Sequence, residues 1–289
     1  MKKKLGPGAI FYILLFLILL YAPIVMMVTY SFNNSELDMG WSGFTLRWYK
    51  ELFAAQDAKK AVINSLIVSC TSTAISILLG AFAAIGFHKF EFKGKNLLDS
   101  FFYIPTIVPA MLLGVSLLSL FDIMHISLSK VTIIISHVTF CMPVCFNNIR
   151  VALNGFDKSI EEAAQDLGCT QIQVITKVLL PNLVPAMLSG GLLAFTFSLE
   201  DVLTTFFVAG PKDITLSMYI FGQMKSGMKP TINALSTLLI IVTVTIGVVM
   251  QVIQNRSIAK KQVGGQHYEE KNLSLTRSIH HGVQPCGMR

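Results

Sequence analysis

The segment from Lys158 to Pro181 reads KSIEEAAQDLGCTQIQVITKVLLP and lies between two long apolar stretches of the chain. It carries Glu162-Ala163-Ala164, then Gly168, and it ends in Leu180-Pro181. A polar segment with regular spacing is unusual in a sequence that is 53% hydrophobic. It is also too long for a simple connector. We therefore interpret it as a surface that the protein offers to a soluble partner.

Two short helices are predicted within this segment. Ser159 and Glu162 have the spacing of a capping box, which predicts the start of the first helix, and Gly168 is the residue type that commonly ends one. Thr170 is placed to cap the second helix, and Pro181 is expected to close it before the next apolar stretch. The alternative is an ordinary amphipathic loop, because Glu-Ala-Ala alone occurs often by chance.

The composition predicts an all-α polytopic membrane protein. Only 13% of the 289 residues are charged, and the mean hydropathy is +0.62. A helix needs about 20 apolar residues to cross the hydrocarbon core of a bilayer. Six stretches come near or exceed this length, and we expect a transmembrane helix in each: 8–30, 62–87, 99–121, 131–150, 186–209 and 232–254.

The basic residues predict that both termini are cytoplasmic. With six helices, most of the 23 lysines and arginines fall on the inner side, as the positive-inside rule requires. The net charge of +7 then follows from topology and from attraction to anionic lipid, without a nucleic acid partner. A cleaved signal peptide is the alternative for the first stretch. We expect residues 1–60 to hold the first helix and an outer loop, 61–256 the main transmembrane domain, and 257–289 a polar tail.

Two further features have both a structural and a functional interpretation. Pro105 and Pro109 break the third predicted helix, which indicates either a cavity beside it or a packing kink. His137, Cys141 and Cys145 are spaced by four residues on one helix face and could supply metal ligands, but small polarizable side chains at a helix seam are the favoured interpretation. We predict no metal site and no catalytic group in this chain.

The complete spacing of the 157–181 segment, from Glu162 through Gly168 to Leu180-Pro181, resembles the EAA loop of the permeases of ATP-binding-cassette (ABC) importers. The resemblance implies a type I importer permease fold with cytoplasmic coupling helices. It also implies that Glu162, Ala163, Ala164, Asp166, Gly168 and Pro181 form the surface that docks into a cytoplasmic ATPase. The chain has no Gly-x-x-x-x-Gly-Lys-Ser/Thr phosphate loop, so ATP and Mg²⁺ are expected on a partner ATPase dimer.

Several segments are similar to the second permease subunit of spermidine and putrescine importers: 136–143, 195–202, 207–211 and 233–235. This implies a bacterial inner-membrane importer for polyamines, with a homologous permease and an extracytoplasmic binding protein as partners. Members of that group carry an acid after the second proline of helix three, where this chain has Ala110. An aminophosphonate or thiamine importer therefore remains an alternative, and an ion-coupled carrier is a further one.

Glu200 and Asp201 are the candidate substrate residues. Charged groups within a membrane helix are costly and are usually functional. Both acids fall in the outer half of the fifth predicted helix, and Thr196, Ser198 and Thr204 continue the polar stripe on its surface. Carboxylates and hydroxyls suit the ammonium groups of a polyamine. The structural alternative is that one acid pairs with a base and only orients the helices.

Overall fold

The computed structural model describes residues 6–36, 40–225, 230–245 and 247–248. The chain divides into two compact units, one reaching Leu238 and one beginning at Leu239. The first unit is helical in its described residues, apart from an isolated bridge between Asn33 and Phe44. Its helices are α1 (Pro7–Tyr30), α2 (Arg47–Ala54), α3 (Gln56–Lys89), α4 (Lys95–Ile107), α5 (Ala110–Ile123), α6 (Lys130–Asn154), α7 (Lys158–Asp166), α8 (Gln171–Gln173), the π-helical turn η1 (Val174–Leu179), α9 (Leu180–Glu200), α10 (Leu203–Val208) and α11 (Leu216–Lys225). A further apolar helix spans Pro230–Thr245.

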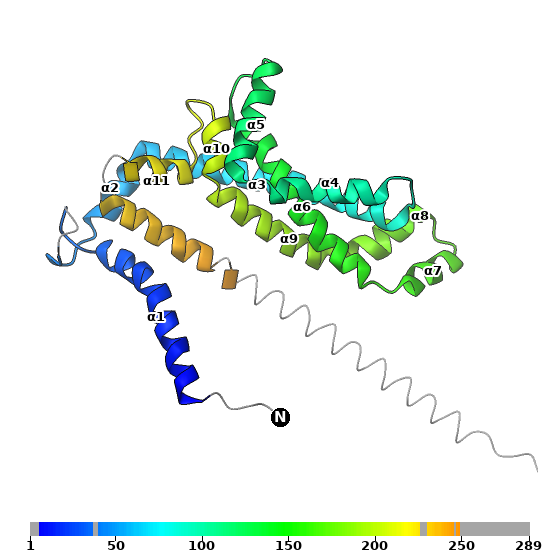
Figure 1. Cartoon of the computed structure of the whole chain (residues 1–289), viewed down its shortest axis with the longest axis horizontal. Coiled ribbons are helices and arrows are strands. Elements are labelled where there is room, and N and C mark those ends of the chain that lie inside the picture. The colour runs from blue at the N-terminus through cyan, green and yellow to red at the C-terminus, as the bar shows by residue number, and fades with distance from the viewer. Residues whose placement is uncertain (1–5, 37–39, 226–229, 246, 249–289) are drawn as a thin grey trace, which may run out of the picture. The chain divides into compact units, whose positions relative to one another are not determined.

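The core of the first unit is the mutual packing of α3, α6 and α9 (Figure 1). Glycines let these helices approach closely, as small residues do in membrane proteins. A Cβ on Gly80 of α3 would lie 2.8 Å from the backbone nitrogen of Phe146 in α6, and one on Gly190 of α9 would lie 3.0 Å from Cβ of Asn148. Phe146, Ile149 and Leu183 fill the space between them and are almost fully buried.

The distribution of side chains is that of a membrane protein. Buried positions on α3 include Ser65, Ser69, Ser72 and Ser76, whereas large apolar side chains such as Leu78 and Phe82 are exposed. Helix α1 is apolar throughout and exposes nearly all of its side chains. Exposed apolar surface on this scale needs a hydrocarbon environment. The predicted all-α membrane fold is confirmed.

The number of crossings is less simple than the predicted six. Four described helical segments are long and apolar enough to span a bilayer: Gly8–Tyr30, Gln56–Lys89, Lys130–Asn154 and Gln171–Glu200. A fifth crossing is possible if α4 and α5 are taken together. The helix expected at 232–254 begins at Pro230 and is described to Thr245. Its end and the polar tail 257–289 lie outside the described residues.

The third predicted helix, 99–121, is not continuous. The chain bends by 106° between α4 and α5. Val108 and Pro109 between them are extended, and proline cannot donate the hydrogen bond that would continue α4. Pro105 is accommodated inside α4. A shallow apolar pocket of about 220 Å³ lies beside this bend, between Pro105 of α4 and Pro143 of α6. The bend confirms the predicted break of this helix.

The fifth predicted helix, 186–209, was wrong at both ends. One helical segment runs from Gln171 to Glu200, so Pro181 does not close the second loop helix. The π-helical turn η1 precedes this proline, and its wider hydrogen-bond spacing lets the helix continue although Pro181 has no backbone N–H to donate. At the other end α9 stops at Glu200, Asp201 is extended, and a separate short helix α10 begins at Leu203.

Candidate functional site

Asp201 holds the break between α9 and α10. Its carboxylate accepts hydrogen bonds from the backbone N–H of Thr205 (2.8 Å) and of Thr204 (3.4 Å), and from the Thr205 hydroxyl (2.8 Å). These are the N–H groups that a helix leaves unsatisfied at its start, so Asp201 caps α10. The side chain is only 10% exposed. The acid therefore has a structural task that the sequence alone did not reveal.

His137 of α6 joins the same network and is completely buried. Its Nδ1 lies 2.7 Å from the Ser198 hydroxyl, and its Nε2 lies 2.9 Å from the Thr205 hydroxyl and 3.6 Å from a carboxylate oxygen of Asp201. Both ring nitrogens are thus occupied by protein partners.

The metal alternative for His137, Cys141 and Cys145 finds no support in this geometry. The thiol of Cys141 donates instead to the backbone carbonyl of Ala194, 3.3 Å away. Within the described ranges, no group of three histidine, cysteine or acidic side chains is arranged to hold a metal ion. Both cysteines are fully buried at the seam with α9.

Ser198 extends the network to α3. Its hydroxyl lies 3.0 Å from that of Ser72 and 3.3 Å from that of Ser69. The polar contacts therefore connect α3, α6, α9 and α10 in one buried cluster, which we call the His137 network: Ser69, Ser72, His137, Ser198, Asp201 and Thr205. A satisfied buried network of this kind fixes one arrangement of the helices.

Glu200 differs from its neighbour. Its side chain is exposed, and it forms no ion pair with another described residue. It lies at the last turn of α9, directly before the break. Of the other predicted path residues, Thr204 is buried, and Thr196 is half-buried with its hydroxyl bonded to the carbonyl of Leu192. The structure thus brings Ser198 and Asp201 together in the interior and leaves Glu200 available to a ligand.

The first helix of the loop, α7, begins two residues earlier than predicted. Asp157, not Ser159, is its cap, and the Asp157 carboxylate accepts from the backbone N–H of Ser159 at 2.9 Å. This hydrogen bond holds the pKa of Asp157 below its usual value. An Asp cap needs no partner at the Glu162 position, so the predicted capping box is wrong here. Gly168, with φ +85°, follows the end of α7 as expected.

The second loop helix starts as predicted, because Thr170 forms a capping box with Gln173.

Most residues of the predicted docking surface are accessible to solvent. Glu162, Ala163, Asp166, Gly168 and Pro181 are exposed, and Ala164 is half-buried. Three apolar side chains that sequence reasoning missed are also exposed on this loop: Ile160 (47%), Leu167 (86%) and Ile172 (72%). Exposed apolar side chains beside polar ones are typical of a protein interface.

Glu161, the acid before Glu162, attaches α7 to the helix bundle. Its side chain is 8% exposed, and it pairs with Lys89 and with His88, whose Nε2 lies 2.9 Å from a carboxylate oxygen. Burial alone would raise the pKa of Glu161, but the hydrogen bonds from Lys89 and His88 outweigh it, and the pKa lies below its ordinary value. Lys89 is the last residue of α3, so the pair ties the loop to the longest of the described helices.

These features define an integral membrane protein that presents a capped helical loop, tied to its bundle by a buried ion pair and bearing an exposed apolar patch. Comparison with known families agrees. Residues 76–262 match the family described as the binding-protein-dependent transport system inner membrane component. The chain belongs to this family, and it is a transporter subunit of the inner membrane.

Two curated relatives show how far the similarity extends. The chain is 36% identical over 238 residues to the spermidine/putrescine transport system permease protein PotC of Haemophilus influenzae, covering 82% of this chain and 93% of the relative. It is 41% identical over 243 residues to the putrescine transport system permease protein PotI of Escherichia coli K12, covering 81% and 86%.

Solved structures share the fold at lower identity. A chain of a bacterial ABC transporter involved in the import of the acidic polysaccharide alginate matches with a TM-score of 0.70 at 17% identity, covering 85% of this chain and 92% of that chain. A chain of the MetNI methionine ABC transporter, in an inward-facing conformation, matches with a TM-score of 0.58, covering 73% and 98%. The type I importer permease fold inferred from the loop is therefore confirmed.

Proposed function

We propose that this chain is a permease subunit of an ATP-driven importer for polyamines. The names of the curated relatives support spermidine and putrescine as the cargo. The structural observation that carries the proposal is Glu200, an exposed carboxylate without an ion pair among the described residues, at the end of a membrane-spanning helix. A charge at this depth is costly unless a ligand or a partner chain neutralises it.

The two acids then have separate roles. Glu200 accepts hydrogen bonds from an ammonium group of the polyamine as that group loses its hydration. Asp201 stays within the His137 network and fixes the position at which α9 ends. Since Asp201 caps α10, it also sets the direction in which the chain leaves Glu200. Thr196, half-buried and one helical turn before Glu200 in α9, provides a further hydroxyl on that face.

Transport is coupled through the loop 157–181. In this proposal its exposed surface docks into one subunit of a cytoplasmic ATPase dimer, which binds ATP and Mg²⁺ and performs the hydrolysis. Movement of α7 passes through Glu161 and Lys89 to α3, whose Ser69 and Ser72 belong to the His137 network. A homologous permease and an extracytoplasmic binding protein complete the assembly, and both termini lie on the cytoplasmic side.

The test is uptake of radiolabelled spermidine and putrescine by proteoliposomes that contain the complete assembly. Glu200→Gln should raise KM for the polyamine at least tenfold while the complex still assembles, because the amide keeps the shape and loses the charge. Asp122→Asn is the matched control, since Asp122 is another exposed acid at the end of a helix. Unchanged polyamine uptake by Glu200→Gln would remove the binding role.

The same preparation distinguishes the alternative cargoes. Ala110 stands where other members of the polyamine group carry an acid, and this leaves an aminophosphonate or thiamine as candidates. Competition of labelled spermidine uptake by excess putrescine, but not by 2-aminoethylphosphonate or thiamine, is the expected result. Uptake that persists without ATP would instead favour an ion-coupled carrier.

A further inference from the structure

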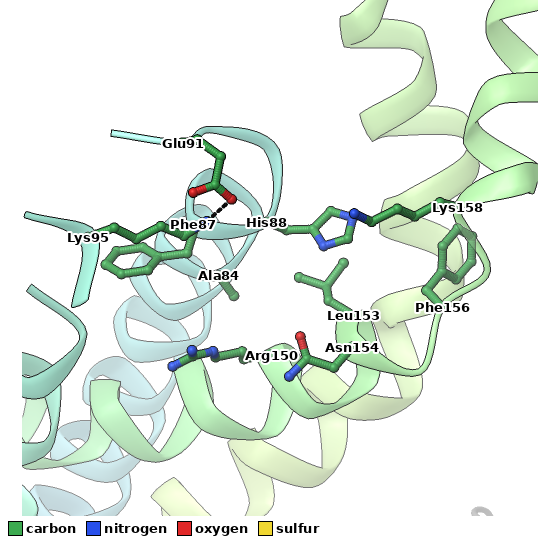
Figure 2. Close-up of a pocket in the computed structure, with 10 residues that line it drawn as sticks. All are labelled: Ala84, Phe87, His88, Glu91, Lys95, Arg150, Leu153, Asn154, Phe156 and Lys158. Carbon is green, nitrogen blue, oxygen red and sulfur yellow. Dashed lines mark hydrogen bonds and ion pairs between the residues drawn. The ribbon is translucent and has the colours of Figure 1, made fainter. Parts of the chain in front are cut away.

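A basic pocket of about 260 Å³ lies on the side of the protein that carries the coupling loop (Figure 2). Its wall is built from four places in the chain: the end of α3, the turn into α4, the end of α6 and the start of α7. Four of its lining side chains are basic, His88, Lys95, Arg150 and Lys158, and Glu91 is the acidic one. We call this site the 88–158 pocket.

The pocket has donors that the described part of the protein uses only in part. Lys158 interacts with Glu91 electrostatically but forms no ion pair with another described residue, and the Asn154 amide has no hydrogen-bond partner among the described residues. Arg150 contacts Asp99 through Nη1 alone, which leaves the other nitrogens of its guanidinium group. Lys95 donates to Glu91 at 2.7 Å and to the carbonyl of Phe90 at 3.2 Å, which leaves one of its three donors; Glu91 is 87% exposed, so water screens the ion pair.

An apolar surface adjoins these donors. Phe90 (67%), Leu97 (73%) and Phe101 (66%) are exposed on the turn before α4 and on α4 itself. The Lys95 ammonium donates a hydrogen bond to the backbone carbonyl of Phe90 at 3.2 Å, so this charged group lies beside the turn that carries the exposed Phe90 side chain. An anionic phospholipid has an anionic phosphate group that matches the donors and, beside it, acyl chains that match the exposed apolar side chains.

We propose that the 88–158 pocket binds the phosphate group of an anionic phospholipid of the inner leaflet, with the acyl chains along the exposed face of α4. The proposal rests on the inner-side placement of the loop in the proposed function and not on the identity of the cargo. Lys158 is the first residue of α7, and His88 also pairs with Glu161. The bound lipid therefore stabilises the start of the coupling helix at the point where it joins α3.

The test measures lipid retained by the intact assembly, so it does not depend on transport. The complex is reconstituted in nanodiscs of phosphatidylcholine with an increasing fraction of phosphatidylglycerol, and the bound phosphatidylglycerol is counted by native mass spectrometry. Lys158→Gln should weaken retention about fivefold, as expected for one charge near a membrane surface. Asn154→Asp, which adds a negative charge without a change of shape, should weaken it further. Lys59→Gln, on an exposed lysine at the opposite end of α3, is the control and should change nothing.

Three results would overturn the proposal. The first is equal retention in Lys158→Gln, Asn154→Asp and the control. The second is loss of bound lipid when millimolar inorganic phosphate is added, because the site would then be one for a free anion. The third is a retention that Lys158→Gln lowers only when the ATPase is present, since the pocket would then belong to the ATPase interface.

Discussion

Neutralising Glu161 should release α7 from the helix bundle without unfolding the protein. Two charges 4 Å apart attract by about 4 kcal/mol at an effective dielectric constant of ~20. Desolvation offsets part of this, and the side chains of Glu161, His88 and Lys89 are 8 to 12% exposed. Removing one partner of a fully buried pair costs ~3 to 5 kcal/mol. Because this pair keeps some contact with solvent, we expect Glu161→Gln to destabilise the docked position of α7 by about 2 kcal/mol, which corresponds to a roughly 30-fold larger undocked population.

Amide hydrogen exchange of α7 in the assembled complex measures that population. Exchange in Lys158–Asp166 should accelerate about 30-fold, and ATP hydrolysis should continue while polyamine uptake per ATP falls. Asp122→Asn is the control, because this exposed acid at the end of α5 lies outside the loop 157–181 and its loss should leave exchange in α7 unchanged. The double variant Glu161→Lys with Lys89→Glu should restore much of the protection by reversing the pair. Unaltered exchange in Glu161→Gln, or failure of the reversed pair to recover any protection, would refute the reasoning.

Three further predictions concern the same loop and the helix core. Because the pKa of Glu161 is lowered, the stability that Glu161 gives to the docked α7 is complete above the pKa of an unfolded glutamate, about 4.5, and is lost as pH falls through the lower folded value. Protection of the α7 amides, corrected for intrinsic exchange rates, should therefore be constant from pH 7 to about 5 and decline below that. Glu161→Gln should remove this decline. Gly80→Ala should lower stability by about 1 to 3 kcal/mol, because its Cβ would meet the backbone of α6. Gly191→Ala should cost less, because its Cβ would meet only the flexible end of the Ile77 side chain, which can turn away. Thermal unfolding in detergent compares the two variants, and equal losses of stability would contradict the packing argument. A Cβ at Gly168 would meet no other atom, but the residue has a positive φ, which is unfavourable for alanine. Gly168→Ala should therefore destabilise the docked α7 by about 1 kcal/mol, measured by amide exchange, and leave the ATPase bound.

The sequence was sufficient for the membrane class and for the position of the helical loop between α6 and α9. Apolar length is a local property, and it placed the helices beginning near Pro7 and Lys130 to within a few residues. Gly168 and Thr170 were assigned correctly as helix-end residues because their conformational preferences act within one turn. The ends of the other helices were harder to predict. Polar turns, for example, extend α3 to Gln56 at one end and to Lys89 at the other, beyond the apolar stretch that the sequence shows.

Contacts between distant segments could not be read from the pattern of residues. Asp201 and His137 are separated by more than sixty positions, and only the packing of α6 on α9 shows that Asp201 is buried while its neighbour Glu200 is exposed. The same holds for Glu161 and Lys89, which join across the chain from α7 to α3. Charge placement predicted that these two residues share the inner side of the membrane, but not that they touch.

The most direct test of the central claim is ATP-dependent uptake of labelled spermidine and putrescine by proteoliposomes that hold this chain with its partner permease, ATPase and binding protein. The expected result is uptake that requires ATP, that excess polyamine inhibits, and whose KM rises at least tenfold in Glu200→Gln but not in Asp122→Asn. Absence of polyamine uptake by an assembly whose ATPase is active, or uptake that Glu200→Gln leaves unchanged, would contradict the account.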